Sequence, residues 1–179
     1  LAQLEELGVV EDAADEDLIE DEVIARFDRQ LRYFSDVSSG EPTPSQSQGR
    51  LESARIAVLG VGGLGGWSAL SLSCCGIGEM LLVDFDEVEL TNLNRQVLYG
   101  EADIGRNKAE AAAERLGSFN SRMRLEVLPK RLESEAEIAA TVEGYDLVID
   151  AIDWPAHDVE RWVNSACFEV GVPFIAMSH

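Results

Sequence analysis

Basic residues are scarce in this chain of 179 residues. Lysine and arginine together number 14, against 34 aspartates and glutamates, which gives a formal net charge of −20 at pH 7. A surface of this kind repels phosphate backbones and anionic lipids, so we expect neither a nucleic-acid partner nor a membrane partner. No apolar run approaches the ~18 residues that a membrane-spanning helix needs, and no basic-then-apolar leader opens the chain.

Cysteine is also rare, since the chain has three, at positions 74, 75 and 167. They form neither a disulfide framework nor a zinc-binding pattern, and we therefore expect a reducing, cytoplasmic setting. The chain begins at Leu1 rather than Met, and its last residue, His179, directly follows an apolar run. We expect it to be a piece of a longer polypeptide whose C-terminal part is missing.

Composition divides the chain into three predicted parts. Residues 1–37 form an N-terminal extension, acidic and partly helical, in which residues 1–24 hold ten acids and no base. Residues 38–50 are rich in Ser, Gly, Pro and Gln, which predicts a flexible linker. From residue 51 to residue 179 the pattern becomes regular and predicts one domain.

Short apolar runs alternate with helical patterns throughout this third part. Strands are predicted within residues 55–60, 79–86, 123–129, 145–153 and 172–178, with helices between them. Such alternation indicates an α/β fold with a doubly wound, mainly parallel, Rossmann-like sheet in the order 3-2-1-4-5. Ligands of these sheets bind beyond the carboxyl ends of the strands, and the chemistry is expected there.

A glycine-rich turn follows the first predicted strand. Gly60, Gly62 and Gly65 meet the GxGxxG spacing, and Gly63 lies within it. Gly60 permits the tight turn, Gly62 lets backbone N–H groups approach a phosphate, and Gly65 lets the helix lie close to the strand. The turn therefore predicts nucleotide binding; the alternative is a purely structural turn.

The residues after the second strand bear on which nucleotide binds. Asp84 ends that strand, where an acid can accept hydrogen bonds from the ribose of NAD or of ATP. Asn92, Arg95 and Lys108 follow, and a triphosphate needs cations such as Arg95 and Lys108 more than a dinucleotide does. The chain has only one other lysine, Lys130. Solvation at the surface is the alternative for Lys108.

Three motifs in this order resemble the ubiquitin-activating-enzyme superfamily, in particular its ThiF/MoeB adenylyltransferase branch. They are GVGGLGG at residues 60–66, VDFDEVELTNLNRQ at 83–96, and the GxxK of 105–108. The resemblance extends from Arg26 to about Met177. It implies an adenylyltransferase that uses ATP and magnesium, with residues 51–179 as its ATP-binding domain.

The resemblance also implies roles for individual residues. Asp84 would hold the ribose, Gln96 would support the loop, and Asp153 would hold magnesium. Arg29 would reach the ATP of the second subunit in a homodimer. The residues expected to be catalytic are Arg29, Arg95, Lys108 and Asp153, and those expected to bind the nucleotide are Gly60, Gly62, Gly63, Gly65, Asp84, Asp86, Asn92 and Gln96. Ile152 and Trp154 depart from the usual threonine and asparagine beside the metal-binding acid.

In this family a C-terminal carboxylate attacks the α-phosphate of ATP and releases pyrophosphate. The resemblance therefore implies as partner the C-terminal tail of a ubiquitin-like carrier protein or of a precursor peptide, and the length of the N-terminal extension favours a peptide. Two other functions stay open. A nicotinamide-dependent oxidoreductase would explain the glycines and Asp84 but leave Arg95 and Lys108 unused. A non-catalytic docking scaffold is the other, and the presence of Asp84, Arg95, Lys108 and Asp153 argues against it.

Overall fold

The structure is a computed structural model that describes residues 20–38, 42–153 and 158–177. The chain divides into two compact units, with the boundary between Ser53 and Ala54. Each unit has its own internal packing, and we describe them separately.

Two helices make up the described part of the first unit. Helix α3 (Asp21–Val37) departs from helical geometry at Phe27, where φ is −105° and ψ is 17°. Helix α4 (Pro44–Ser53) packs against α3. The side chain of Gln30 donates a hydrogen bond of 2.7 Å to the side chain of Gln48, which links the two helices. Most of the acidic run at residues 1–24 lies outside the described residues.

Helix α4 corrects the prediction of a flexible linker over residues 38–50, which is wrong from Pro44 onward. The physical reason is a capping box. The Thr43 hydroxyl accepts a hydrogen bond from the backbone N–H of Gln46 at 3.2 Å, and the Gln46 side chain accepts one from the N–H of Thr43 at 3.1 Å. Pro44 follows the cap directly, at the first helical position, where its missing N–H costs nothing.

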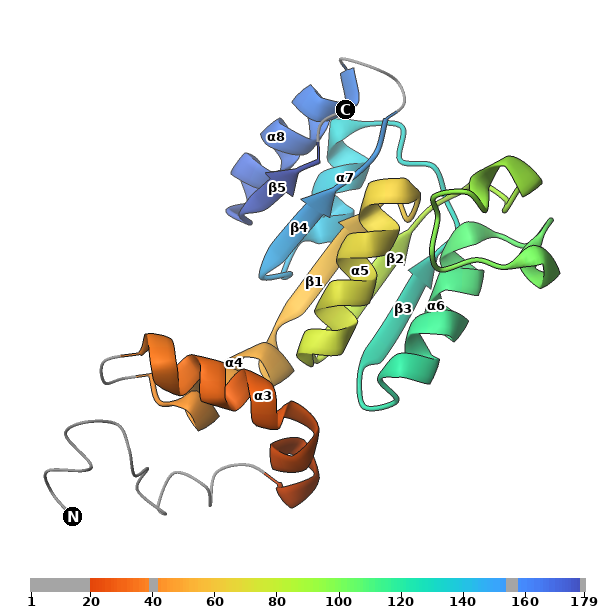
Figure 1. The fold of residues 1–179 in the computed structure, drawn as a ribbon. Coiled ribbons are helices and arrows are strands. Elements are labelled where there is room, and N and C mark those ends of the chain that lie inside the picture. Colours follow the sequence, from red (N-terminus) through yellow and green to blue (C-terminus); the bar gives the residue numbers. More distant parts are fainter. Residues whose placement is uncertain (1–19, 39–41, 154–157, 178–179) are drawn as a thin grey trace, which may run out of the picture. The chain divides into compact units, whose positions relative to one another are not determined.

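The second unit contains a sheet of five parallel strands (Figure 1). The strands are β1 (Arg55–Leu59), β2 (Glu79–Val83), β3 (Arg124–Leu128), β4 (Leu147–Asp150) and β5 (Phe174–Ala176). Their order is β3-β2-β1-β4-β5, which confirms the predicted doubly wound topology. Leu59 is in register with Val83 on one side and with Asp150 on the other, so the central strands end at the same edge.

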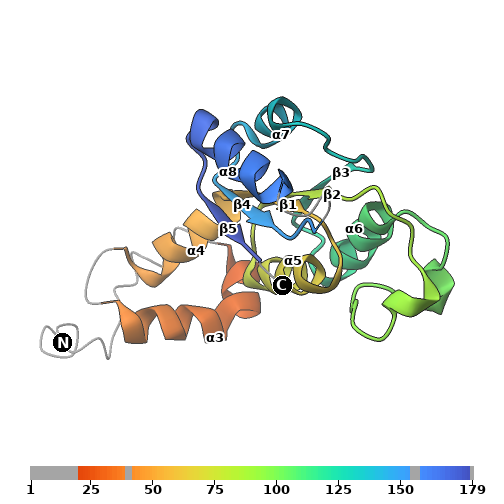
Figure 2. The same cartoon turned by 90° about the horizontal axis from the view of Figure 1, so that it is seen from above.

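Helices cover both faces of this sheet, as the view in Figure 2 shows. Helices α5 (Gly63–Cys75) and α6 (Lys108–Phe119) lie on one face, and α7 (Glu135–Val142) and α8 (Asp158–Val170) lie on the other. Because both faces are covered, β1 and β2 are buried along nearly their whole length. Within the described residues, no helix is both long and apolar enough to cross a bilayer.

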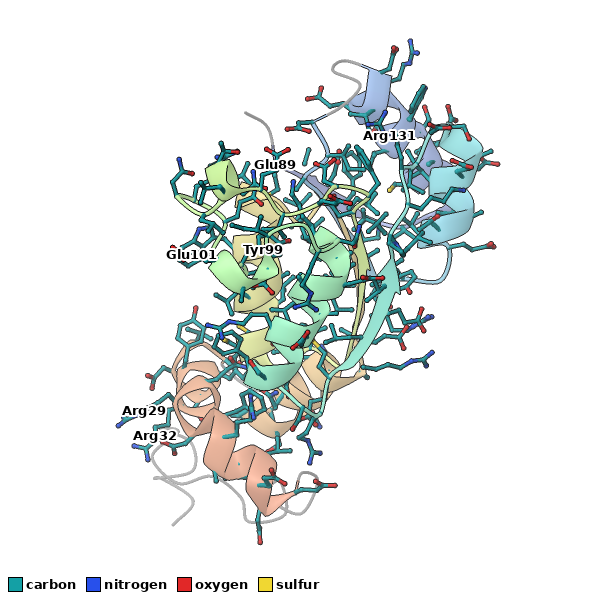
Figure 3. The ribbon with its side chains drawn as sticks, turned by 90° about the vertical axis from the view of Figure 1, so that its right-hand side faces the viewer. Arg29, Arg32, Glu89, Tyr99, Glu101 and Arg131 are labelled. Carbon is teal, nitrogen blue, oxygen red and sulfur yellow. The ribbon has the colours of Figure 1, made fainter. Side chains whose placement is uncertain are left out.

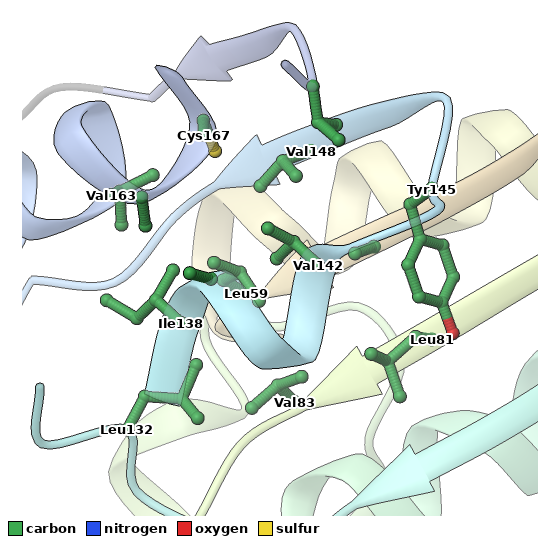
Figure 4. Close-up of a cluster of buried hydrophobic side chains, with 14 of the residues drawn as sticks. Leu59, Leu81, Val83, Leu132, Ile138, Val142, Tyr145, Val148, Val163 and Cys167 are labelled. Carbon is green, nitrogen blue, oxygen red and sulfur yellow. The ribbon is translucent and has the colours of Figure 1, made fainter. Parts of the chain in front are cut away.

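Strand side chains alternate between two buried layers. Ala57 and Leu59 of β1 pack toward α7 and α8, whereas Ile56 and Val58 point to the opposite face. Figure 4 shows the first layer, in which the strand residues meet Ile138 and Val142 of α7 and Val163 and Cys167 of α8. This packing fixes the strand ends from which the functional loops emerge.

The connection between β2 and α6 is the longest in the second unit. It contains two short 3₁₀ helices, η1 (Leu90–Asn92) and η2 (Glu101–Asp103). The backbone of Val88 anchors it, since its N–H donates to Arg106 O at 2.8 Å and its C=O accepts from Gly105 N at 2.9 Å. The loop is thus folded back on itself before α6 begins at Lys108.

Candidate active site

A pocket opens at the edge where β1, β2 and β4 end. Asp84, Lys108 and Asp153 all line it, so the structure brings together three residues that the sequence placed far apart. Its other lining residues are Gly60, Gly62, Val83, Phe85, Asp86, Lys130, Arg131, Leu132, Ala151 and Ile152.

The glycine loop approaches other backbone too closely for side chains at two positions. Gly60 has φ +85°, and a Cβ there would lie 2.7 Å from Ala151 O. A Cβ on Gly65 would lie 1.8 Å from Gly60 O, so helix α5 could not pack as it does. Gly62 is different, because a Cβ there would meet only the Gln96 side chain, at 3.7 Å. Gly62 is therefore the position where the loop leaves room for a ligand, next to the start of α5 at Gly63.

Asp84 ties the glycine loop to the end of β2. One carboxylate oxygen accepts a hydrogen bond from Val61 N, and the other accepts one from Asp86 N, each at 2.9 Å. Burial raises the pKa of Asp84, while these two N–H donors and Lys108 act in the opposite direction. Asp84 thus holds the loop in place and also faces the pocket.

Lys108 is buried but reaches the pocket from the first turn of α6. Its ammonium lies 2.9 Å from Asp86 Oδ2, and its backbone N–H donates to Asp86 O at 2.8 Å. Asn107 caps the helix, since its side chain accepts from Glu110 N at 3.1 Å. An ammonium has three donors, so the pair with Asp86 fixes the Lys108 side chain and leaves capacity for an anion.

Tyr99, labelled in Figure 3, links this lysine to the glycine loop. Its hydroxyl lies 2.8 Å from Val61 O and 3.2 Å from Lys108 O. Burial, together with Asp84, Asp103 and Asp86, raises the pKa of the phenol, which therefore stays a hydrogen-bond donor. Sequence reasoning missed Tyr99, because its hydrogen bonds to Val61 O and Lys108 O join segments that no sequence motif connects.

Three predicted residues of the β2–α6 connection do not line the pocket. The side chain of Asn92 is buried and accepts from Glu89 N at 2.9 Å, which closes the turn of η1. Gln96 is buried beside Gly62, and its Oε1 atom has no hydrogen-bond partner in the part of the chain that the structure describes. Arg95 is exposed, and its Cδ atom lies 3.8 Å from the position of a Cβ on Gly63.

Two aspartates near the end of β4 have different surroundings: Asp150 is its last residue, and Asp153 lies beyond it. Asp153 is exposed and lines the pocket. Asp150 is 3% exposed, its Oδ1 atom accepts from Ile152 N at 3.3 Å, and burial with a contribution from Glu160 raises its pKa to about 6. Over residues 20–38, 42–153 and 158–177, no group of three or more His, Cys, Asp or Glu residues is arranged to hold a metal ion. Trp154 lies outside these ranges.

Arg29 belongs to the first unit, on helix α3, where its side chain is 91% exposed. Its Nε atom lies 3.9 Å from Asp28 Oδ2, and Arg32 forms a closer pair with the same carboxylate at 3.0 Å. Figure 3 shows both arginine side chains extending from the helix. The exposed position leaves the Arg29 guanidinium available for a contact outside its own helix.

Sequence reasoning also missed the pocket residues that follow β3. Lys130 and Arg131 come directly after this strand and its proline, and both are exposed. The Lys130 ammonium pairs with Glu137 Oε1 at 2.8 Å, whereas the Arg131 guanidinium carbon lies 3.9 Å from the centroid of the Phe85 ring. The expectation that ligands bind beyond the strand ends includes the end of β3, but no motif there singled out Lys130 or Arg131.

A parallel sheet with a glycine loop, an acid at the end of β2 and a lysine at the start of α6 is typical of nucleotide-binding α/β proteins. The ThiF family matches residues 27–178, which is most of the chain, and the chain belongs to this family.

Among the proteins similar to this chain are one characterised enzyme and two solved structures. Over 160 residues, the chain is 33% identical to the molybdopterin-synthase adenylyltransferase of Escherichia coli, with 88% of this chain and 59% of that protein covered. The solved structure of PaaA superposes with a TM-score of 0.88 at 32% identity, covering 99% of this chain and 54% of that one. Escherichia coli MccB, solved with AMPCPP and MccA, gives a TM-score of 0.83 at 28% identity, covering 99% and 50%. The chain thus spans between half and three fifths of these relatives.

Proposed function

We propose that this chain is the nucleotide-binding part of an adenylyltransferase, which activates the C-terminal carboxylate of a small protein or peptide with ATP. The observation that carries the proposal is the meeting of Asp84, Lys108 and Asp153 in one pocket beside the glycine loop. A ribose acceptor, a phosphate-binding cation and a carboxylate that can hold a metal are the three groups that such a reaction needs. The adenylyltransferase in the name of the Escherichia coli relative supports the same activity.

The phosphates of ATP would lie at the start of α5. The backbone N–H groups near Gly62 and Gly63 are free of helical partners, and the helix end carries a partial positive charge. The Lys108 ammonium would donate to the phosphates with the protons that its pair with Asp86 does not use. Arg95, next to Gly63, would approach the same phosphates from the outside of the loop.

Asp84 would accept hydrogen bonds from the ribose hydroxyls. Each of its carboxylate oxygens accepts one backbone N–H, from Val61 and from Asp86, and each can accept a further donor. The same two backbone bonds hold the carboxylate in a fixed direction, which lowers the entropic cost of binding.

The chemistry of the pocket fits a magnesium ion held mainly by ATP. Magnesium keeps several waters and takes one or two protein carboxylates together with substrate phosphates, so a single exposed acid such as Asp153 is enough. When bound, the ion would neutralise phosphate charge and polarise the reacting phosphoryl group. Asp150, which is buried and engaged with Ile152 N, is the poorer candidate.

In the proposed reaction, a carboxylate oxygen forms a bond to the α-phosphorus of ATP, and the bond to the leaving pyrophosphate breaks. The carboxylate is already ionised at pH 7, so no general base is required. The difficulty is the approach of one anion to another, and the protein would contribute position and positive charge. Lys108 and Arg95 would supply that charge from within the second unit.

We also propose the molecules with which this chain interacts. MccB has been solved with ATP and with MccA, which supports a nucleotide and a second, acyl-bearing partner for this chain. We propose a homodimer in which Arg29 reaches the ATP of the other subunit, which its 91% exposure allows. The acyl partner would be the tail of a carrier protein or of a precursor peptide.

Titration with ATP and magnesium, followed by an assay of pyrophosphate release, tests the proposal. The purified protein should bind ATP more tightly than NAD, and release should begin when a carrier protein or peptide with a free C-terminal carboxylate is added. The same peptide with an amidated C-terminus is the matched control, because it lacks the nucleophile. Preference for NAD would favour the oxidoreductase, and absence of any nucleotide binding would favour the docking scaffold.

A further inference from the structure

The two elements that would bind phosphate come from different parts of the second unit. The glycine loop lies between β1 and α5, whereas Lys108 opens α6 beyond the long β2–α6 connection. One ligand can contact both elements only if the distance between them is fixed, because binding and positioning are lost when the contacting groups drift apart. The contacts that join the loop to the start of α6 therefore bear on phosphate binding.

A closed circuit of hydrogen bonds joins these two elements. On one side, the two oxygens of Asp84 accept from Val61 N and from Asp86 N, each at 2.9 Å. Asp86 Oδ2 in turn accepts from the Lys108 ammonium at 2.9 Å. On the other side, the Tyr99 hydroxyl lies 2.8 Å from Val61 O and 3.2 Å from Lys108 O. The circuit thus has an acidic side and a phenolic side.

The two sides of this circuit differ in their access to a ligand. Asp84, Asp86 and Lys108 line the pocket, so a nucleotide would share their hydrogen bonds, and Lys108 would divide its protons between Asp86 and phosphate. Tyr99 is 8% exposed, is not among the lining residues, and bonds through its hydroxyl to backbone carbonyls. The phenolic side therefore keeps its partners while the acidic side exchanges some of its own.

We propose that Tyr99 is a positioning residue, whose hydroxyl holds the glycine loop and Lys108 at the spacing that a polyphosphate requires. The inference rests on the proposed function for the placement of phosphates at these two elements. Asp84 keeps its hydrogen bond from Asp86 N whether or not the phenol is present, so the place of the ribose depends less on Tyr99. The contribution of Tyr99 therefore concerns the phosphates more than the nucleoside.

Equilibrium binding of ATP and of adenosine to the full chain tests this inference. Tyr99→Phe keeps the ring and removes the hydroxyl. It should raise the Kd for ATP by about 3- to 10-fold, the range expected for one lost hydrogen bond, and the Kd for adenosine by less than about twofold. Tyr145→Phe is the matched control, because Tyr145 is also 8% exposed and its hydroxyl donates to Glu126 Oε2 at 3.3 Å outside this pocket. Both of its Kd values should stay at the wild-type level.

A double variant separates positioning from a general loosening of the fold. If Tyr99 acts through the lysine, its effect on the Kd for ATP should fall to less than half, on a logarithmic scale, in a Lys108→Met background, because no ammonium is left to position. A merely structural tyrosine would raise the Kd for ATP and for adenosine alike. An unchanged Kd for ATP in Tyr99→Phe, an equal change for adenosine, or an effect that persists in Lys108→Met would each overturn the inference.

Failure of the proposed function looks different. The wild-type protein would then bind ATP more tightly than adenosine, with the dependence on Tyr99 intact, but would release no pyrophosphate with any carboxylate partner. A wild-type protein that binds neither ligand, or that binds adenosine as tightly as ATP, has no working phosphate site and would overturn both.

Discussion

Replacing Asp150 with asparagine should stabilise the protein at neutral pH and have little effect in acid. Asp150 is 3% exposed at the end of β4, and burial raises its pKa to about 6 from an ordinary value of 3.8. At a pH between these two values, Asp150 is ionised in the unfolded chain but protonated in the folded protein. The contribution of Asp150 to stability is therefore most favourable below pH 3.8 and is lost as the pH rises through 6.

The magnitude follows from the two pKa values. Each tenfold change in proton affinity is worth about 1.4 kcal/mol, so the buried charge costs at most about 3 kcal/mol at pH 8. At pH 5, where the folded protein is still mostly protonated, the cost is about half as large. Asparagine keeps an oxygen that can accept the N–H of Ile152, as Asp150 Oδ1 does at 3.3 Å, and so removes the charge without removing the bond.

Urea unfolding of the wild-type protein and of Asp150→Asn between pH 5 and pH 8 measures the difference in their free energies of unfolding. The advantage of Asp150→Asn should grow by about 1–1.5 kcal/mol over this interval. Glu169→Gln, an exposed change on α8, is the control for the loss of one negative charge. If Asp150→Asn and wild type keep a constant difference across the interval, the buried carboxylate is not ionising as described and the reasoning is refuted.

Three further substitutions test the site. Lys108→Met should weaken ATP use by about 10- to 100-fold in a pyrophosphate-release assay, as expected for a lost charge-assisted contact, with little change in thermal unfolding; wild-type activity would contradict its role. Asp153→Asn should abolish magnesium-dependent adenylation while ATP binding in EDTA persists; retained adenylation would move the metal site toward Asp150. Arg29→Ala mixed with Lys108→Met should be more active than either variant alone, since mixed dimers hold one intact site, whereas absence of rescue would exclude action across the dimer.

The topology of the sheet could be predicted because its strands carry a simple signal. Both faces of β1 and β2 are buried, and such strands read as uninterrupted apolar runs between helical patterns. Right-handed crossovers then leave few possible strand orders. Helix α4 was missed for the opposite reason, since its Ser and Gln content outweighed the capping box of Thr43 and Gln46 in the prediction. A short local motif decided the structure there.

The candidate site could be predicted only where a residue directly follows a strand or opens a helix. Asp84 directly follows β2 and Lys108 opens α6, whereas Asp153 was named only through the family resemblance; all three meet in one pocket. Asn92 lies in an irregular connection, and its side chain turns to Glu89 N instead. Arg131 lies in none of the quoted motifs and contacts Phe85 from a separate loop, so no local pattern predicts its place at the pocket.

Tyr99 has a consequence for kinetic work on this protein. Its hydroxyl lies between the carbonyls of Val61 and Lys108, and burial with neighbouring acids raises the pKa of the phenol above its ordinary value. The hydrogen bonds from this phenol to the glycine loop and to helix α6 are therefore expected to persist above the pH at which an ordinary tyrosine ionises. An alkaline limb in a rate profile can accordingly be assigned to groups other than this phenol.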